Sequence, residues 1–89
     1  KAAAVDHARQ GIRVNAVCPG DVETPMLLGG IEHRGDDAKL GLQKNGEAIP
    51  MGRVGQPSEI AQAVSFLASD EASFMTGHAM LVDGGNTAQ

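Results

Sequence analysis

The sequence predicts an α/β fold in which two parallel strands form part of a larger doubly wound sheet. Apolar segments at 12–18 and 79–83 are rich in residues that favour strands, and a helical pattern at 57–68 separates them. A helix between two such strands is a crossover connection, which makes the pair parallel. Two strands cannot bury both of their faces, so we expect other sequence or partner chains to complete the sheet.

The chain begins with a predicted helix over residues 1–10. This segment is rich in alanine, a strong helix former, and it carries His7 and Arg9 in its last turn, where positive charge suits the helix dipole. Gly11 follows as a C-cap. We therefore expect the helix to end at about Gln10.

The first strand is predicted over 12–18, where alternating apolar residues indicate an extended, covered segment. Pro19 removes a backbone donor and Gly20 permits unusual dihedral angles, so regular pairing is expected to end at Cys18. Cys18 is the only cysteine, and we interpret it as a small buried hydrophobic residue rather than as half of a disulfide.

Short helices are expected between Thr24 and Pro50, because this segment mixes apolar, charged and glycine residues. Pro57 then starts a helix that runs to about residue 68. Ser69 and Asp70 are expected to cap a short turn that reaches Phe74, before the second strand.

Composition restricts the classes of function. The chain has 89 residues and a formal charge of -4, which argues against a nucleic-acid partner. No apolar run approaches the ~20 residues that cross a bilayer, so we expect no membrane partner and a cytoplasmic protein. The chain starts at Lys1 and contains neither Trp nor Tyr, which suggests a C-terminal fragment with a marginal core.

The loop that follows the first strand is the predicted binding site. Ligands of open parallel sheets bind beyond the carboxyl ends of the strands, and the segment PGDVET occupies that position. Pro19 and Gly20 turn the chain, Val22 offers its backbone N–H and C=O, and the Thr24 hydroxyl can donate and accept. This set of groups suits a planar amide.

Three segments resemble one known family in order and spacing. These are IRVNAVCPGDVETPM, MGRVGQPSEIAQAVSFLASDEASFMTG and LVDGG, and they resemble the last third of the classical short-chain dehydrogenases/reductases over nearly the whole chain. The resemblance implies that residues 1–89 form the C-terminal portion of one NAD(P)-binding Rossmann domain. The parent enzyme would transfer a hydride between NAD or NADP and an alcohol or ketone substrate.

The resemblance also implies roles for single residues. Pro19, Gly20, Val22 and Thr24 match the nicotinamide-side loop, with the Val22 backbone on the carboxamide and Thr24 on the carboxamide or the nearby phosphates. The other interpretation is a simple strand-ending turn followed by a capped helix. The family's catalytic Tyr and Lys are not found here because the chain has no Tyr, so we expect the 89 residues alone to be inactive. The choice between NAD and NADP stays open.

Residues 26–50 match the family's substrate loop. Within this loop Met26, Leu27, Leu28 and Ile31 are expected to close over an apolar substrate, while 32–39 face water. Its glycines allow hinge motion. A surface excursion with two weak helices is the alternative interpretation.

Several conspicuous residues are interpreted as structural. The three histidines have no spacing that suits a metal site, and the tripeptide at 34–36 is discounted as an adhesion motif. Arg13 and Asn15 are polar residues in a strand that should be covered, so each is expected to find a hydrogen-bond partner or solvent. The family resemblance implies that Asn15, Arg53 and Glu59 help to fix loops to the core.

The family resemblance places 83–85 near subunit contacts, which implies a homotetramer. The alternative function is a non-catalytic nucleotide-binding or scaffold protein of the same fold, which would lack the upstream Tyr and Lys.

Overall fold

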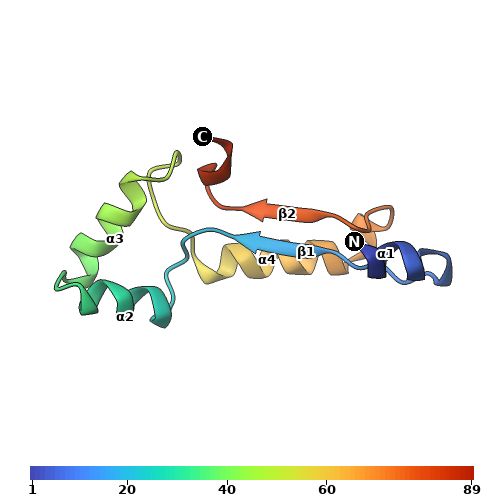
Figure 1. Ribbon diagram of the computed structural model, residues 1–89, viewed down its shortest axis with the longest axis horizontal. Helices are drawn as coiled ribbons and strands as arrows, with labels where there is room; N and C mark the ends of the chain where they lie inside the picture. Colours follow the sequence, from blue (N-terminus) through green and yellow to red (C-terminus); the bar gives the residue numbers. More distant parts are fainter.

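A two-stranded parallel sheet forms the centre of the computed structural model, which describes residues 1–89. Strand β1 (Ala16–Pro19) pairs with β2 (Ala79–Val82), with Ala16 opposite Ala79 and Pro19 opposite Val82. Helix α4 (Pro57–Ala68) runs alongside both strands and covers one face of the sheet (Figure 1). The predicted α/β class, the parallel pairing and the crossover helix are confirmed.

The regular strand differs from the prediction at both ends. It begins at Ala16 rather than at residue 12, because side chains replace ladder bonds before it: the Val14 N–H donates to Thr76 Oγ1, and the His78 N–H donates to Asn15 Oδ1. Pairing also continues past Cys18, since the Gly20 N–H donates to the Val82 carbonyl over 3.1 Å. Pro19 is tolerated because it stands at the end of the ladder.

The first helix follows its sequence signals. Helix α1 (Ala2–His7) continues into a 3-10 turn, η1 (Ala8–Gln10), and Gly11 closes it with a φ of 78°. The Gly11 N–H donates to the Ala8 carbonyl over 3.2 Å. The end at Gln10 and the glycine cap are therefore confirmed.

Two short helices occupy the segment after β1, as predicted. They are α2 (Pro25–His33) and α3 (Ala38–Glu47), and each begins at a side-chain cap. Oγ1 of Thr24 accepts from the Leu27 N–H, and Oδ1 of Asp37 accepts from the Leu40 N–H. The two helices form a hairpin at one end of a molecule 51 Å long and 24 by 22 Å across (Figure 1).

The segment after α4 corrects one expectation. A 3-10 turn, η2 (Asp70–Ala72), follows the helix, but the side chain of Ser69, its N-cap residue, makes no capping hydrogen bond. The Ser69 hydroxyl instead donates to the Phe66 carbonyl over 2.7 Å, which satisfies an end group of α4. Another 3-10 turn, η3 (Asn86–Ala88), follows β2 at the end of the chain.

Two polar side chains fasten the sheet to α4. The Arg13 guanidinium donates to the carbonyls of Leu67, Ser69 and Met75 over 2.8–3.3 Å. Nδ2 of Asn15 also donates to the Met75 carbonyl, over 3.0 Å. Both residues are half-buried, so these bonds offset the cost of covering them. Their predicted structural role is confirmed.

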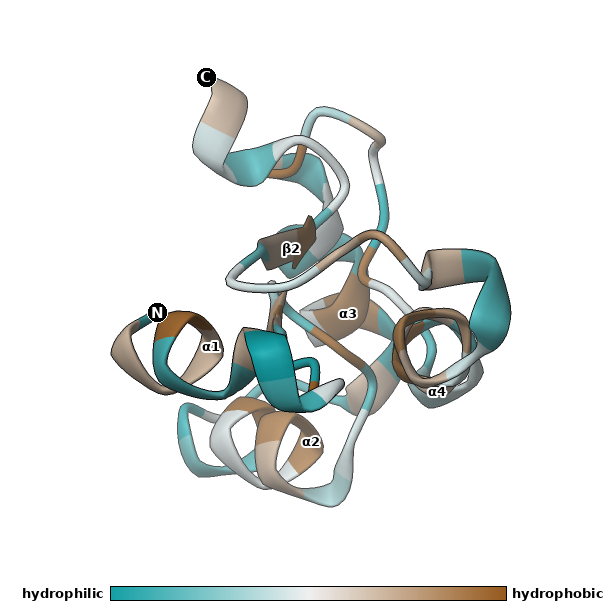
Figure 2. Ribbon diagram, turned by 90° about the vertical axis from the view of Figure 1, so that its right-hand side faces the viewer, coloured by the Kyte–Doolittle hydropathy of each residue, from teal (hydrophilic) through white to brown (hydrophobic).

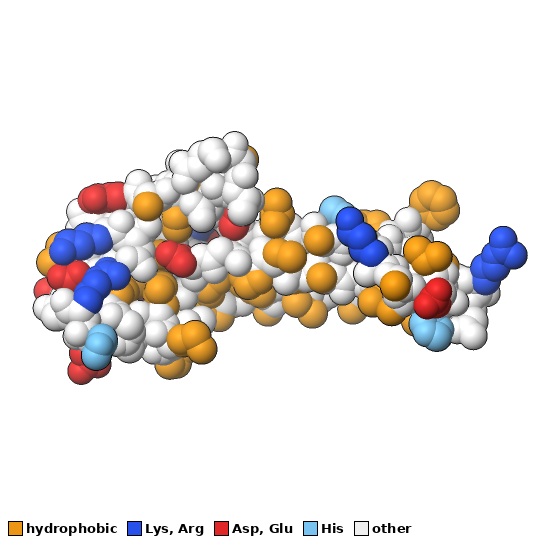
Figure 3. Space-filling view, viewed as in Figure 1, with side chains coloured by type: hydrophobic (Ala, Val, Ile, Leu, Met, Phe, Trp, Pro, Cys, Tyr) orange, Lys and Arg blue, Asp and Glu red, His pale blue; other side chains and the backbone are white.

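Hydrophobic side chains are only partly covered. Six are buried: Ala4, Ile31, Ile49, Val54, Leu67 and Ala72. Others stay open, among them Phe74, which is fully exposed, and Leu81 at 59%. Figure 2 shows β2 hydrophobic along its length, and Figure 3 shows hydrophobic side chains over the strand half, with charged ones gathered at the α2–α3 end. Cys18 is half-buried rather than buried, because its sheet is incompletely covered.

None of the helices combines the length and the apolar character that crossing a bilayer requires.

The α2–α3 hairpin packs closely at one point. Ile31 is 1% exposed and lies against Gly41, where an added Cβ would overlap Ile31 Cγ2 and lie 2.9 Å from Cγ1. Gly29, on α2, has nothing within 4 Å of the corresponding position. The two glycines thus share a helical setting and differ in packing.

We predict opposite effects for alanine at these two glycines. Gly29→Ala should raise the free energy of unfolding by about 0.5–1 kcal/mol, since alanine is the better helix former. Gly41→Ala should lower it by about 1–3 kcal/mol, because the methyl group separates the hairpin. Urea denaturation of both variants measures this, and equal shifts would contradict the packing described.

Candidate functional site

The candidate site begins where both strands end at the same edge of the sheet. The chains that leave β1 and β2 approach closely there, since a Cβ on Gly20 would lie 2.8 Å from Asp83 Cβ. No side chain fits in that contact, so glycine is required. The loop 20–24 is therefore held against the turn that follows β2.

The backbone of Val22 presents unpaired polar groups. An isolated parallel bridge joins Val22 to Gly55. The Gly55 N–H donates to the Asp21 carbonyl, and the Glu23 N–H donates to the Gly55 carbonyl, both over 2.9 Å. Because these bonds use the residues on either side, the N–H and C=O of Val22 point the other way and have no partner in the chain. One donor and one acceptor are thus displayed together.

Thr24 connects this loop to α2. Its Oγ1 accepts from the Leu27 N–H over 3.3 Å, and Pro25 takes the first helical position. The hydroxyl proton remains available to donate, since the cap uses only the acceptor. Thr24 therefore serves as the cap and keeps one donor for a ligand.

A hollow of about 480 Å³ brings the loop and α2 together. Its lining comprises Pro19, Gly20, Asp21, Val22, Thr24, Met26, Leu27, Gly30, Ile31 and Arg34. All four residues expected to bind the cofactor are present, with Met26, Leu27 and Ile31 of the expected substrate set. Leu28 does not line it. Met26 is 88% exposed, whereas Ile31 is buried and packs against Gly41 of α3.

Sequence reasoning missed Asp21, Gly30 and Arg34. Helical spacing offered a signal for the last two, because Leu27, Gly30 and Arg34, the C-cap residue of α2, follow one another at intervals of three and four residues. The expectation that 32–39 face water holds for most of the segment. Arg34, however, borders the hollow, and Asp36 is half-buried.

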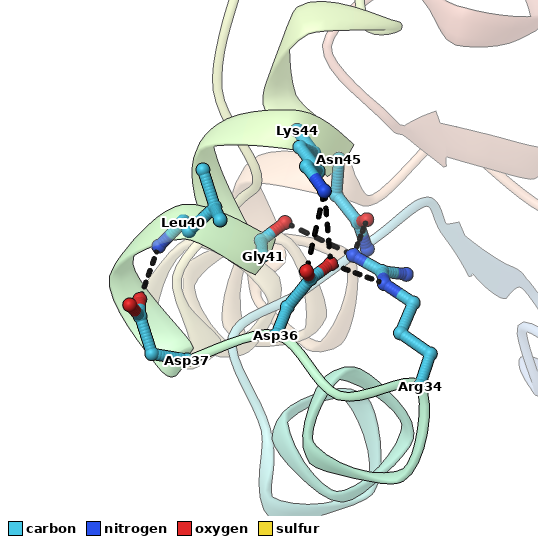
Figure 4. A network of polar contacts seen from close by, with 7 residues as sticks. All are labelled: Arg34, Asp36, Asp37, Leu40, Gly41, Lys44 and Asn45. Atoms are coloured by element: carbon cyan, nitrogen blue, oxygen red, sulfur yellow. Dashed lines mark hydrogen bonds and ion pairs between the residues drawn. The ribbon is translucent and has the colours of Figure 1, made fainter.

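A polar network fixes the hairpin behind the hollow (Figure 4). Nε of Arg34 donates to Asp36 Oδ2 over 2.9 Å, and Nζ of Lys44 donates to Oδ1 of the same carboxylate over 3.2 Å. Nη2 of Arg34 reaches Asn45 Oδ1 over 2.9 Å and the Gly41 carbonyl over 3.4 Å. The hydrogen bonds from Arg34 and Lys44 lower the pKa of Asp36. The tripeptide 34–36 is thus engaged within its own chain.

A second hollow, of about 250 Å³, lies beside the bridge at Gly55 and is lined in part by Arg53 and Glu59. The Arg53 guanidinium donates to both oxygens of Glu59, over 2.9 and 3.0 Å. Glu59 also accepts from the Gln56 N–H over 2.9 Å at the start of α4. The bonds from Arg53, then the bond from Gln56, lower the pKa of Glu59 to about 2. This pair therefore holds the loop that carries Gly55.

The turn after β2 completes this region. The Asp83 carboxylate accepts from the Thr87 hydroxyl and N–H and from the Gly85 N–H, and these bonds lower its pKa. The Met51 N–H donates to the Gly84 carbonyl over 3.1 Å. The carboxylates here serve the fold, and no group of three or more His, Cys, Asp or Glu side chains is placed to hold a metal ion.

Comparison with known proteins gives consistent similarities. The family model described as enoyl-(acyl carrier protein) reductase matches residues 1–87. The 2-keto-3-deoxy-L-fuconate dehydrogenase of Xanthomonas campestris is 47% identical over 85 residues, covering 96% of this chain and 28% of that protein.

Solved structures agree with this match. The aldohexose dehydrogenase of Thermoplasma acidophilum, as a C-terminal deletion mutant, superposes with a TM-score of 0.95 at 40% identity, covering 100% of this chain and 40% of that one. ElxO with NADP bound gives 0.82 at 33% identity, covering 99% and 34%. The chain thus spans between 28% and 40% of the length of these proteins.

The Arg53–Glu59 pair predicts a dependence of stability on pH. The folded pKa of about 2 lies below the ordinary value of 4.5, so the stabilisation is complete above pH 4.5 and is lost as the pH falls towards 2. The difference in Tm between the protein and Glu59→Gln should therefore be present at pH 7 and shrink through this range. Thermal melts at several pH values measure it. A Tm difference that stays constant between pH 7 and pH 2.5 would rule the pair out as its source.

Proposed function

Because this chain belongs to the short-chain dehydrogenase/reductase family, we propose that it forms the nicotinamide-side wall of an NAD(P)-dependent oxidoreductase. The reaction is hydride transfer between the cofactor and an alcohol or ketone. Support comes from two relatives that are named dehydrogenases and from a third that was solved with NADP. Their names refer to 2-keto-3-deoxy-L-fuconate and to aldohexose, so the names alone do not fix one substrate.

The observation that carries this proposal is the unpaired N–H and C=O of Val22 at the edge of the larger hollow. A carboxamide has one carbonyl acceptor and one NH₂ donor, which this pair of groups complements. The residues present therefore fit a nicotinamide. When bound, that ring supplies the hydride chemistry.

The residues around Val22 have distinct tasks in the proposed site. Pro19 and Gly20 end the strand and set the direction of the loop, and Val22 fixes which face of the ring meets the substrate. Thr24 donates its hydroxyl proton to the carboxamide or to a nearby phosphate. The bridge to Gly55 keeps these groups in place before the ligand arrives, which lowers the cost of ordering them.

Residues 26–50 are proposed as the substrate loop. Helix α2, the first helix of the hairpin, lines the hollow together with the loop 20–24, and Met26 on this helix is exposed. The polar network and the packing of Ile31 on Gly41 support movement of the hairpin as one body.

The acid–base chemistry is assigned to residues outside these 89. The family pairs a Tyr with a Lys, and this chain has no Tyr. We therefore propose that the 89 residues alone give no turnover, and measurable oxidation of any alcohol by them would contradict this. A homotetramer is also proposed for the parent protein, supported by exposed apolar side chains such as Val64 and Leu81.

The role of Val22 is tested by a matched pair of variants in the full-length protein. Val22→Pro removes the N–H and should weaken NADH binding about tenfold or more, because the carboxamide oxygen loses its donor. Binding of ADP-ribose, which lacks the nicotinamide, should not change. Fluorescence and calorimetric titrations measure both affinities.

Val22→Ala is the control, since it keeps the backbone groups and should bind NADH as before. Equal loss of NADH and ADP-ribose in Val22→Pro would show a general disruption of the loop. Unchanged NADH binding would refute the proposed contact.

A further inference from the structure

Arg34 is the one basic residue among those that line the larger hollow. Three of its hydrogen bonds use Nε and Nη2, which go to Asp36, Asn45 and the Gly41 carbonyl. Nη1 makes no hydrogen bond within the chain, and Figure 4 shows that end of the guanidinium without a partner. The side chain is therefore held in place while one edge, with two N–H donors, remains available.

The charges around Arg34 favour an anion. Asp36 is shared between Arg34 and Lys44, at 2.9 and 3.2 Å, so one carboxylate is paired with two cations. The neighbouring Asp37 carboxylate instead accepts from the Leu40 N–H at the start of α3. Asp21 is the other charged residue in the lining, and it lies on the loop after β1 rather than on the hairpin. An anionic group thus finds its complement at the Arg34 end of the hollow.

We propose that Nη1 of Arg34 binds the carboxylate of the substrate, so that the site takes a hydroxy acid or the corresponding keto acid. This inference rests on the proposed function for the reacting end of the substrate. A guanidinium edge binds a carboxylate through charge-assisted hydrogen bonds, which are stronger than bonds between neutral groups. Arg34 is thereby a specificity-determining residue.

The position of Arg34 also sets the length of the acid. Arg34 follows the Thr24 cap by ten residues, about 15 Å along a helix at 1.5 Å per residue, and its guanidinium is held against Asp36, Asn45 and the Gly41 carbonyl. The substrate must span the remaining distance between the loop and the guanidinium. Several carbon atoms therefore separate its carboxylate from the carbon that exchanges the hydride.

The test uses the full-length protein and a defined set of probes. Aldonates of four to six carbons are compared with alditols of the same length, which carry the hydroxyls without the carboxylate, and calorimetry measures their affinities in the presence of NADH. Aldonates should bind more tightly than alditols. Arg34→Met should weaken aldonate binding by about 10- to 100-fold and leave alditol binding unchanged.

Asp36→Asn separates binding by Arg34 from its structural role. This variant breaks the ion pair that clamps the hairpin but leaves the guanidinium, so aldonate affinity should be kept or increased. If Arg34 merely supports the hairpin, both variants should weaken binding alike, and that result would overturn the proposal. Failure of every aldonate to bind the NADH-loaded protein would also overturn it.

The NADH titration distinguishes the two proposals. If NADH binds tightly and no aldonate binds, only the proposed role of Arg34 is contradicted, and the proposed function stands. Aldonate binding that is sensitive to Arg34→Met, in a protein that does not bind NADH, supports the anion site and contradicts the proposed function.

Discussion

The parallel alignment of β1 and β2 is the constraint on which the rest of the structure depends. It brings both strands to the same edge, where Gly20 contacts Asp83 without room for a side chain. From that contact the chain must turn away from the sheet, and the bridge to Gly55 fixes how it turns. The unpaired groups of Val22 and the start of α2 both follow from this geometry.

Side chains hold each end of the sheet where the ladder stops. At the amino ends of the strands, the side chains of Arg13 and Asn15 donate hydrogen bonds to backbone carbonyls at and after the end of α4. At the carboxyl ends, the Asp83 turn and the Arg53–Glu59 pair secure the segments that flank the site. The loop 20–24 is thus anchored from two sides, which keeps its backbone donors and acceptors ordered without a ligand.

Local rules predicted much of this fold, because the relevant signals lie within a few residues of one another. The Gly11 cap and the helix that begins at Pro57 are of this kind. The start of β1 was missed, since it depends on hydrogen bonds from the Val14 N–H to Thr76 and from the His78 N–H to Asn15, each across more than 60 residues.

The same distinction applies to the candidate site. Pro19, Gly20, Val22 and Thr24 stand together in sequence, so the order of the loop indicated them. The bridge to Gly55 joins segments that are distant in sequence and carries no local signal. Arg34 is exposed, as expected for its charged segment, but its position in the lining of the hollow was not predicted.

The most direct measurement is a crystal structure of the full-length protein with NADH. The carboxamide oxygen should lie within about 3.2 Å of the Val22 nitrogen, and the carboxamide nitrogen within the same distance of the Val22 oxygen. A nicotinamide bound elsewhere, or Val22 groups already paired with another strand, would contradict this placement.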